Sequence, residues 1–177
     1  LRLSDNKRAL YSDLGRTLTL KGELDAAKKV LIRSLRLAEN APDMPASERE
    51  RAISQAYVDL AELAIHCGDK TSAQQSLEHA QHCPSEHSDL HAKIHNLLGV
   101  TARMFGKLDE AAEHYRRAET LYESLGDLER GLSVTLNLSN VMADAGDRVA
   151  AFAAYETVRT KAKRMGDKKH EAMAAAN

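Results

Sequence analysis

Histidine and cysteine, the side chains best suited to metal ligation, gather in one stretch of this sequence. Six of the eight histidines and both cysteines lie between His66 and His95. Imidazole and thiolate groups bind zinc when three or four of them converge within about 2.0–2.3 Å of one point. The spacing permits such a site, and its candidate ligands are His79, His82, Cys83, His87 and His91.

A structural role for these histidines is the better interpretation. The sequence has neither a Cys-x-x-Cys pair nor the His-Glu-x-x-His motif of a metalloprotease. His87 and His91 fall at the expected start of a helix, where an exposed face is the ordinary outcome. We therefore predict no metal site and no cofactor, and we keep a His/Cys metal-binding module as the least favoured alternative.

Motifs for nucleophilic catalysis, phosphate binding and dinucleotide binding do not occur in this sequence. Gly-x-Ser-x-Gly, Gly-x-x-x-x-Gly-Lys-Ser/Thr and Gly-x-Gly-x-x-Gly are all missing. Acidic side chains such as Asp109 and Glu110 match the solvated side of a helix, where charge pairs four residues apart are ordinary. The sequence predicts that the protein is not an enzyme.

The composition of the 177 residues excludes several further classes of protein. Lys and Arg number 25 against 26 Asp and Glu, a net charge of -1, which is not the footprint of a general nucleic-acid binder. Aromatic residues make up 4% of the chain, too few for a strand-rich fold. No apolar run approaches the ~20 residues of a membrane span, and two cysteines are too few for a disulfide scaffold. We expect a cytoplasmic protein without a direct nucleic-acid or membrane partner.

Four glycines mark an internal repeat that must position any functional side chain. Gly22, Gly68, Gly106 and Gly146 are separated by 46, 38 and 40 residues. Seven residues before each glycine stands a small residue preceded by leucine, in the pairs Leu14-Gly15, Leu60-Ala61, Leu98-Gly99 and Leu138-Ser139. Apolar residues recur at three and four spacings on both sides of each glycine, which indicates two amphipathic helices around a tight turn.

The pattern predicts helices over four pairs of ranges, with a ninth helix beginning near Lys168. The pairs are 5–20 and 24–39, 47–66 and 70–82, 87–105 and 108–124, and 128–145 and 148–165. The loop around Pro42 and Pro45 explains the longest spacing. Ser47 followed by Glu50 predicts a capping box at the start of the third helix.

The repeat resembles the tetratricopeptide repeat (TPR) family in a longer form of ~40 residues. The third unit carries the whole family pattern as Leu98-Gly99, Gly106, Ala111, Tyr115 and Ala118. The resemblance implies an all-α fold, a right-handed superhelical solenoid of antiparallel helix pairs. It makes residues 1–177 a single repeat domain, with repeats at about 5–41, 47–84, 87–125 and 128–165 and the start of a fifth at 168–177. We expect the chain to be a fragment of a longer protein.

The resemblance further implies a concave wall formed by the first helix of each pair, which grasps a peptide or a partner helix. Wall positions fall three before, one after and four after each small residue: Ser12, Arg16 and Thr19; Val58, Glu62 and Ile65; Asn96, Val100 and Arg103; Leu136, Asn140 and Ala143. Lys93 and Asn137 lie close to this wall, and a packing role is the alternative for Val58 and Leu136. The predicted partner-binding residues are Arg16, Glu62, Lys93, Asn96, Arg103, Asn137 and Asn140.

Two chemical arguments support this choice. An asparagine amide both donates to and accepts from a peptide backbone, and Asn140 is the strongest single candidate. Arg16 and Arg103 are suited to receiving carboxylates. We therefore predict a non-enzymatic scaffold that binds a protein or peptide. The alternative is a ligand-sensing or regulatory repeat module that works alongside further domains in a larger signalling or transcription-regulator protein.

Overall fold

The structure is a computed structural model that describes residues 3–84 and 88–176, with the side chains described from residue 7 onward. All regular secondary structure in these ranges is α-helical. The chain forms two compact units, Leu1–Leu97 and Leu98–Asn177. Within the described ranges, none of the helices combines the length and apolar character needed to cross a membrane.

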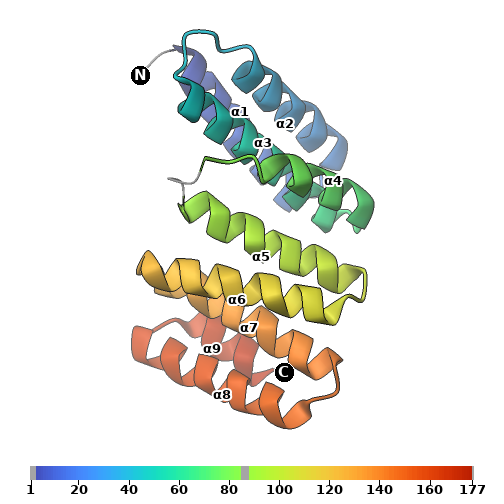
Figure 1. Cartoon of the computed structure of the whole chain (residues 1–177), viewed down its shortest axis with the longest axis vertical. Helices are drawn as coiled ribbons and strands as arrows, with labels where there is room; N and C mark the ends of the chain where they lie inside the picture. Colours follow the sequence, from blue (N-terminus) through green and yellow to red (C-terminus); the bar gives the residue numbers. More distant parts are fainter. Residues whose placement is uncertain (1–2, 85–87, 177) are drawn as a thin grey trace. The chain divides into compact units, whose positions relative to one another are not determined.

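The first unit contains α1 (Leu3–Leu20), α2 (Leu24–Glu39), α3 (Ala46–His66), α4 (Lys70–Ala80) and the first part of α5 (Ser88–Met104). Figure 1 shows α1 and α2 as one pair of helices and α3 and α4 as the next. α2 packs against both α1 and α3, and α4 packs against α3. α1 and α3 also contact each other directly, as the first helices of successive pairs.

The second unit contains the rest of α5, then α6 (Leu108–Ser124), α7 (Leu128–Asp144), α8 (Arg148–Met165) and α9 (Lys168–Ala175). α7 packs against α6 and α8, while α9 packs against α8 and α7 (Figure 1). The pattern of contacts in the first unit is therefore repeated. Every helix predicted from the sequence is present, with ends displaced by two residues or fewer.

Glycine and aspartate set the helix ends. Gly22, Gly68, Gly106 and Gly146 turn the chain within each pair with φ between 72° and 86°, a left-handed conformation that only glycine adopts without steric cost. Four helices, α4, α7, α8 and α9, begin after an aspartate whose carboxylate accepts the backbone N–H three residues on, at Asp69, Asp127, Asp147 and Asp167, whereas α2 and α6 have no side-chain capping bond. Such caps are each worth ~1 kcal/mol.

The predicted capping box at Ser47 is wrong. α3 begins one residue earlier, at Ala46, and Pro45 is its N-cap with no side-chain capping bond. Pro45 has an extended backbone (φ -51°, ψ 143°), and the chain becomes helical immediately after it. Ser47 therefore lies inside the first turn, where its backbone is already helical and it cannot be the capping residue.

The small residue of each repeat leaves room for a large side chain from the second helix. A Cβ atom added at Gly15 would lie 2.3 Å from Leu31 Cδ2, and one added at Gly99 would lie 2.7 Å from the Tyr115 ring. Both distances are far inside van der Waals contact. Leu31 and Tyr115 are 0% and 1% exposed, so each helix pair closes over this contact.

Candidate functional site

In the first unit, the predicted wall residues of α1 and α3 line a common hollow of about 350 Å³. Four of the lining residues are wall positions predicted from the sequence: Arg16, Thr19, Glu62 and Ile65. Thr19 contributes mainly packing, because it is 8% exposed and its hydroxyl donates to Gly15 O at 2.9 Å. The other lining residues are Leu20, Asp59, His66 and Leu97.

The charged side chains of this hollow are already paired within the protein. Lys93 Nζ on α5 donates to Glu62 Oε2 at 3.1 Å, and both side chains are largely covered. Arg16 binds Asp13, one turn earlier on α1, and this hydrogen bond is the main cause that raises the pKa of Arg16. A peptide carboxylate would have to compete with these internal partners.

Asp59 is a functional candidate that the sequence argument missed. Its side chain is 1% exposed, and it accepts hydrogen bonds from Ser12 Oγ and, at 2.9 Å, from Gln55 Nε2. Burial raises the pKa of this carboxyl, although the bond from Ser12 and the nearby charge of Lys93 oppose the shift. The available signal was an acidic residue inside an otherwise apolar stretch of α3, two positions before the small residue Ala61.

In the second unit, Asn140 is held by a tyrosine from the neighbouring helix. Tyr155 of α8 donates its hydroxyl proton to Asn140 Oδ1 at 2.7 Å. Burial raises the pKa of Tyr155, so its hydroxyl stays protonated as a donor. The bond occupies the amide oxygen of Asn140, which is half-buried. The sequence argument identified Asn140 but did not foresee that Tyr155 orients it.

Arg103 forms an ion pair that links two first helices of this unit. Its Nε donates to Asp144 Oδ2 at 2.5 Å, from α5 to α7, and both side chains are about two-fifths exposed. The hydrogen bond to Asp144 raises the pKa of Arg103. A guanidinium has five N–H donors and the bond to Asp144 uses the one on Nε, so Arg103 retains donors for a partner.

Two predicted wall positions belong instead to the core. Val58 is 0% exposed and Leu136 is 2% exposed. Leu136 packs in one cluster with Tyr155 of α8 and Ala174 of α9. The cause is the direct contact between successive first helices, which covers an apolar side chain three residues before the small position. The predicted Asn96 and Asn137 are half-buried.

Comparisons with known proteins identify the repeat. Two family models described as Tetratricopeptide repeat match residues 52–124 and 9–40. The chain belongs to the tetratricopeptide-repeat family. No curated protein sequence matches this chain.

Solved structures support the tetratricopeptide-repeat fold. The apo form of RapI is 15% identical with a TM-score of 0.78, over 98% of this chain and 47% of that chain. Aspartyl phosphate phosphatase F from Bacillus subtilis is 10% identical with a TM-score of 0.80, over 99% of this chain and 45% of that chain. A Podosopora anserina protein described as a kinesin light chain with nearly identical TPR-like repeats is 16% identical with a TM-score of 0.70, over 93% and 78%. The chain spans about half the length of the first two proteins.

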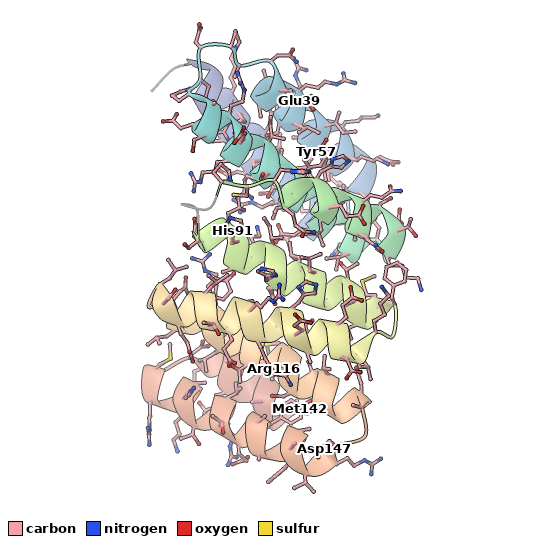
Figure 2. All side chains as sticks on the ribbon, in the orientation of Figure 1. Glu39, Tyr57, His91, Arg116, Met142 and Asp147 are labelled. Carbon is pink, nitrogen blue, oxygen red and sulfur yellow. The ribbon has the colours of Figure 1, made fainter. Side chains whose placement is uncertain are left out.

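The histidine and cysteine candidates of this TPR protein have separate surroundings. His79 stacks on Tyr57, with ring centroids 4.7 Å apart (Tyr57 is labelled in Figure 2). His91 Nε2 lies 3.1 Å from Pro84 O, Cys83 is buried and His82 is exposed. His87 lies outside the described residues. Over the ranges that the structure describes, no three His, Cys, Asp or Glu side chains form a group able to hold a metal.

A Ser-His-Asp arrangement in the second unit was not foreseen. Ser133 Oγ lies 2.7 Å from His170 Nε2, and His170 Nδ1 lies 2.5 Å from Asp167 Oδ2. These are the contacts of a catalytic triad, but Ser133 stands inside α7, where backbone N–H groups are bonded to the preceding turn and form no oxyanion hole. His170 is 2% exposed. The arrangement therefore joins α9 to α7 as a structural link in the repeat.

Proposed function

We propose that this chain is a non-enzymatic protein-interaction scaffold that binds an extended peptide along its first helices. The observation that carries the proposal is the orientation of Asn140, whose Oδ1 is held at 2.7 Å by the Tyr155 hydroxyl. An amide held through its oxygen can donate from Nδ2 to a peptide carbonyl without first losing rotamer freedom. Backbone recognition of this kind places few demands on the peptide sequence.

Sequence preference comes from the charged side chains on the same helices. Arg103 keeps guanidinium donors beyond the one that Asp144 occupies, and a peptide carboxylate would bind there in competition with Asp144. In the first unit, the Lys93 and Glu62 pair at 3.1 Å offers both signs of charge beside the hollow. We infer a preference for peptides that carry a carboxylate near Arg103.

A selection from random twelve-residue peptides on the immobilised protein tests the proposal. Selected peptides should bind the wild type and lose about ten-fold or more in affinity on Asn140→Ala or Arg103→Ala, because each change removes a donor to the peptide. Arg116→Ala is the matched control, since Arg116 is an exposed arginine on the second helix α6 (labelled in Figure 2). Undiminished binding by both wall variants would refute the assignment of the binding surface.

The competing carboxylate allows a test in the opposite direction. Asp144→Ala releases the Nε donor of Arg103, so acidic peptides should bind the variant more tightly than the wild type. Titration at two salt concentrations separates this effect from non-specific attraction, because exposed charge contacts weaken as salt rises. A loss of affinity in Asp144→Ala would mean that Asp144 itself contacts the peptide.

A second proposal follows the alternative made from the sequence, a regulatory repeat module in a cytoplasmic signalling protein. Its support is the fold shared with RapI and with aspartyl phosphate phosphatase F. Binding of a selected peptide should then change the activity or assembly of the parent protein, measured with and without peptide. If saturating peptide changed neither the activity nor the assembly of the parent protein, the regulatory proposal would be contradicted and only the scaffold role would remain.

A further inference from the structure

A hollow of about 290 Å³ opens in the second unit on a face of α7 that the predicted wall does not use. Its floor is apolar, formed by Leu128, Gly131 and Leu132 of α7 with Met165 of α8. Glu119, Glu123 and Asp127 line one side, Thr135 contributes from α7, and Lys161 and Arg164 line the other side. The volume is at the lower end of the ~300–1,000 Å³ typical of ligand pockets, which suits one large side chain.

The missing side chain of Gly131 helps to create this hollow. The position eight residues before the small residue carries Lys7, Ile53 and His91 in the first three repeats and glycine in the fourth. A Cβ atom added at Gly131 would meet nothing closer than Tyr122 Cβ at 4.0 Å. Glycine inside a helix costs ~1 kcal/mol relative to alanine, and no close packing contact accounts for it here.

The length of the flanking helices also matters. α6 has 17 residues and α8 has 18, whereas α4 has 11. Glu119 and Glu123 lie in the last two turns of α6, and Lys161 and Arg164 lie in the last two turns of α8, where all four line the hollow beside the start of α7. The hollow is therefore built from the last turns of α6 and α8, which the shorter α4 does not have.

The two sides of the hollow differ in the charges that they leave available. Asp127 caps α7 and binds Arg130, and Glu119 accepts a hydrogen bond from Thr135 at 2.6 Å. Lys161, Arg164 and Glu123 form no ion pair within the part of the chain that the structure describes. The apolar floor thus lies between two cations on α8 and one carboxylate on α6 that form no ion pair among the described residues.

We propose that this hollow binds a peptide segment of a partner protein in which one large apolar side chain is flanked by an acidic residue on one side and a basic residue on the other. The apolar side chain enters the space above Gly131 and is removed from water. The acidic residue lies toward Lys161 and Arg164, and the basic residue lies toward Glu123. The charge pattern sets the direction of the segment, because the reversed order places like charges together.

Synthetic peptides test the proposal directly. The probes are fluorescein-labelled alanine-based nonapeptides with a central leucine, one lysine and one glutamate, placed one to three residues from the centre in both orders. At least one should bind the intact chain, as measured by fluorescence anisotropy, and should shift the amide resonances of α6, α7 and α8 in ¹⁵N spectra. No binding by any probe at about 1 mM would overturn the proposal.

Two variants decide whether the binding occurs in the hollow. Gly131→Leu fills the space, so binding should fall about ten-fold or more. Its thermal midpoint should not fall, because leucine is the better helix former and the position is open. Charge reversal by Lys161→Glu with Arg164→Glu should weaken the best probe similarly and should favour the probe whose glutamate is replaced by lysine.

Arg148→Glu is the matched control on α8, since Arg148 is exposed and outside the hollow. Binding by this control should equal that of the wild type. Binding that tolerates Gly131→Leu, or that ignores the exchange of charges, would overturn the proposal. Asn140→Ala and Arg103→Ala should leave this binding unchanged, which separates it from binding along the predicted wall.

Discussion

The two units place different side chains at the same packing position and obtain different polar surfaces from it. Opposite the small residue, the first unit carries Leu31 and Leu77, whereas the second carries Tyr115 and Tyr155. The Tyr155 hydroxyl extends beyond the core to Asn140 on the neighbouring first helix. A leucine has no such group.

In the first unit, the polar side chains of the first helices instead bond to one another. Asp59 is buried between Ser12 and Gln55, and Lys93 pairs with Glu62. The same repeat can therefore orient a first-helix side chain in two ways. A core residue of the second helix can bond to it, or neighbouring first-helix side chains can bond to it. The consequence is an amide held by a core tyrosine in the second unit and a set of charges paired with one another in the first.

Replacing a core tyrosine of the second unit should have the largest effect on the free energy of unfolding. Tyr115→Ala should lower the free energy of unfolding by ~3–5 kcal/mol, because it empties a fully buried aromatic site. Leu31→Ala is the counterpart in the first unit and should cost ~2–5 kcal/mol. Urea denaturation followed by circular dichroism measures both. A cost below about 1 kcal/mol for Tyr115→Ala would contradict the packing described for the third repeat.

Small residues should be equally necessary in the two units. Gly99→Ala drives a methyl group to within 2.7 Å of the Tyr115 ring, and Gly15→Ala does the same against Leu31 at 2.3 Å. Each should lower the free energy of unfolding by ~1–3 kcal/mol through overpacking. Gly131→Ala is the matched helical control, where the free energy should rise by up to ~1 kcal/mol. Equal effects at all three glycines would exclude packing as the cause.

Loss of the hydrogen bond that orients Asn140 should have a smaller effect on the free energy of unfolding. Tyr155→Phe removes the donor to Asn140 Oδ1 and should lower the free energy of unfolding by ~0.5–1.5 kcal/mol. Tyr57→Phe is the control, because the Tyr57 ring stacks on His79 and the change keeps that ring. If peptide affinity stayed intact in Tyr155→Phe, Asn140 would not need its tyrosine to bind a partner.

The buried carboxylate of the first unit should produce the smallest effect, a difference in pH dependence. An Asp carboxyl in the unfolded chain has a pKa of about 3.9, and burial raises the pKa of Asp59 in the folded protein. The folded state therefore favours the protonated form. The free energy of unfolding should fall as pH rises between the unfolded and the folded pKa, with the loss complete above the latter.

Asp59→Asn should remove this component, so the variant should lose less stability than the wild type between about pH 3 and pH 7. Urea denaturation at each pH measures the difference. Asp25→Asn replaces an exposed carboxylate and is the control. A wild-type profile that rises with pH relative to Asp59→Asn would show that the hydrogen bonds from Ser12 and Gln55 outweigh the burial of this carboxyl.

Local rules are enough to predict most of this fold from the sequence. Glycine at turns such as Gly106 and the periodic apolar residues locate each helix within two residues, because both signals act within a few turns of the chain. The small residues at Gly15 and Gly99 likewise predict close contact with the second helices. The predicted extent of a single repeat domain over residues 1–177 stays a prediction.

The candidate site was less predictable, because it depends on which helices cover which side chains. Spacing placed Leu136 on the wall, but contact with α9 buries it. Spacing also identified Asn140 and Arg103 without their partners Tyr155 and Asp144, which come from other helices. The apolar residues around Asp59 in the sequence indicated burial, but its bonding partners Ser12 and Gln55 depend on how α1 and α3 pack.

The link between Ser133, His170 and Asp167 teaches a related lesson. Its members are separated by up to 37 residues, and only the packing of α9 on α7 brings them together. Asp167 could be expected as a helix cap, but its contact with the His170 ring depends on the tertiary fold. Sequence spacing therefore predicts elements and caps better than it predicts contacts between repeats.

The central claim is that a peptide binds along the first helices, and an amide chemical-shift map of the complex with a selected peptide tests it most directly. The account predicts that the largest shifts in the second unit occur in its first helices, around Arg103 of α5 and Asn140 of α7, and that these shifts are missing from complexes of the Asn140→Ala and Arg103→Ala variants. Shifts confined to the second helices α2, α4, α6 and α8 would contradict the account.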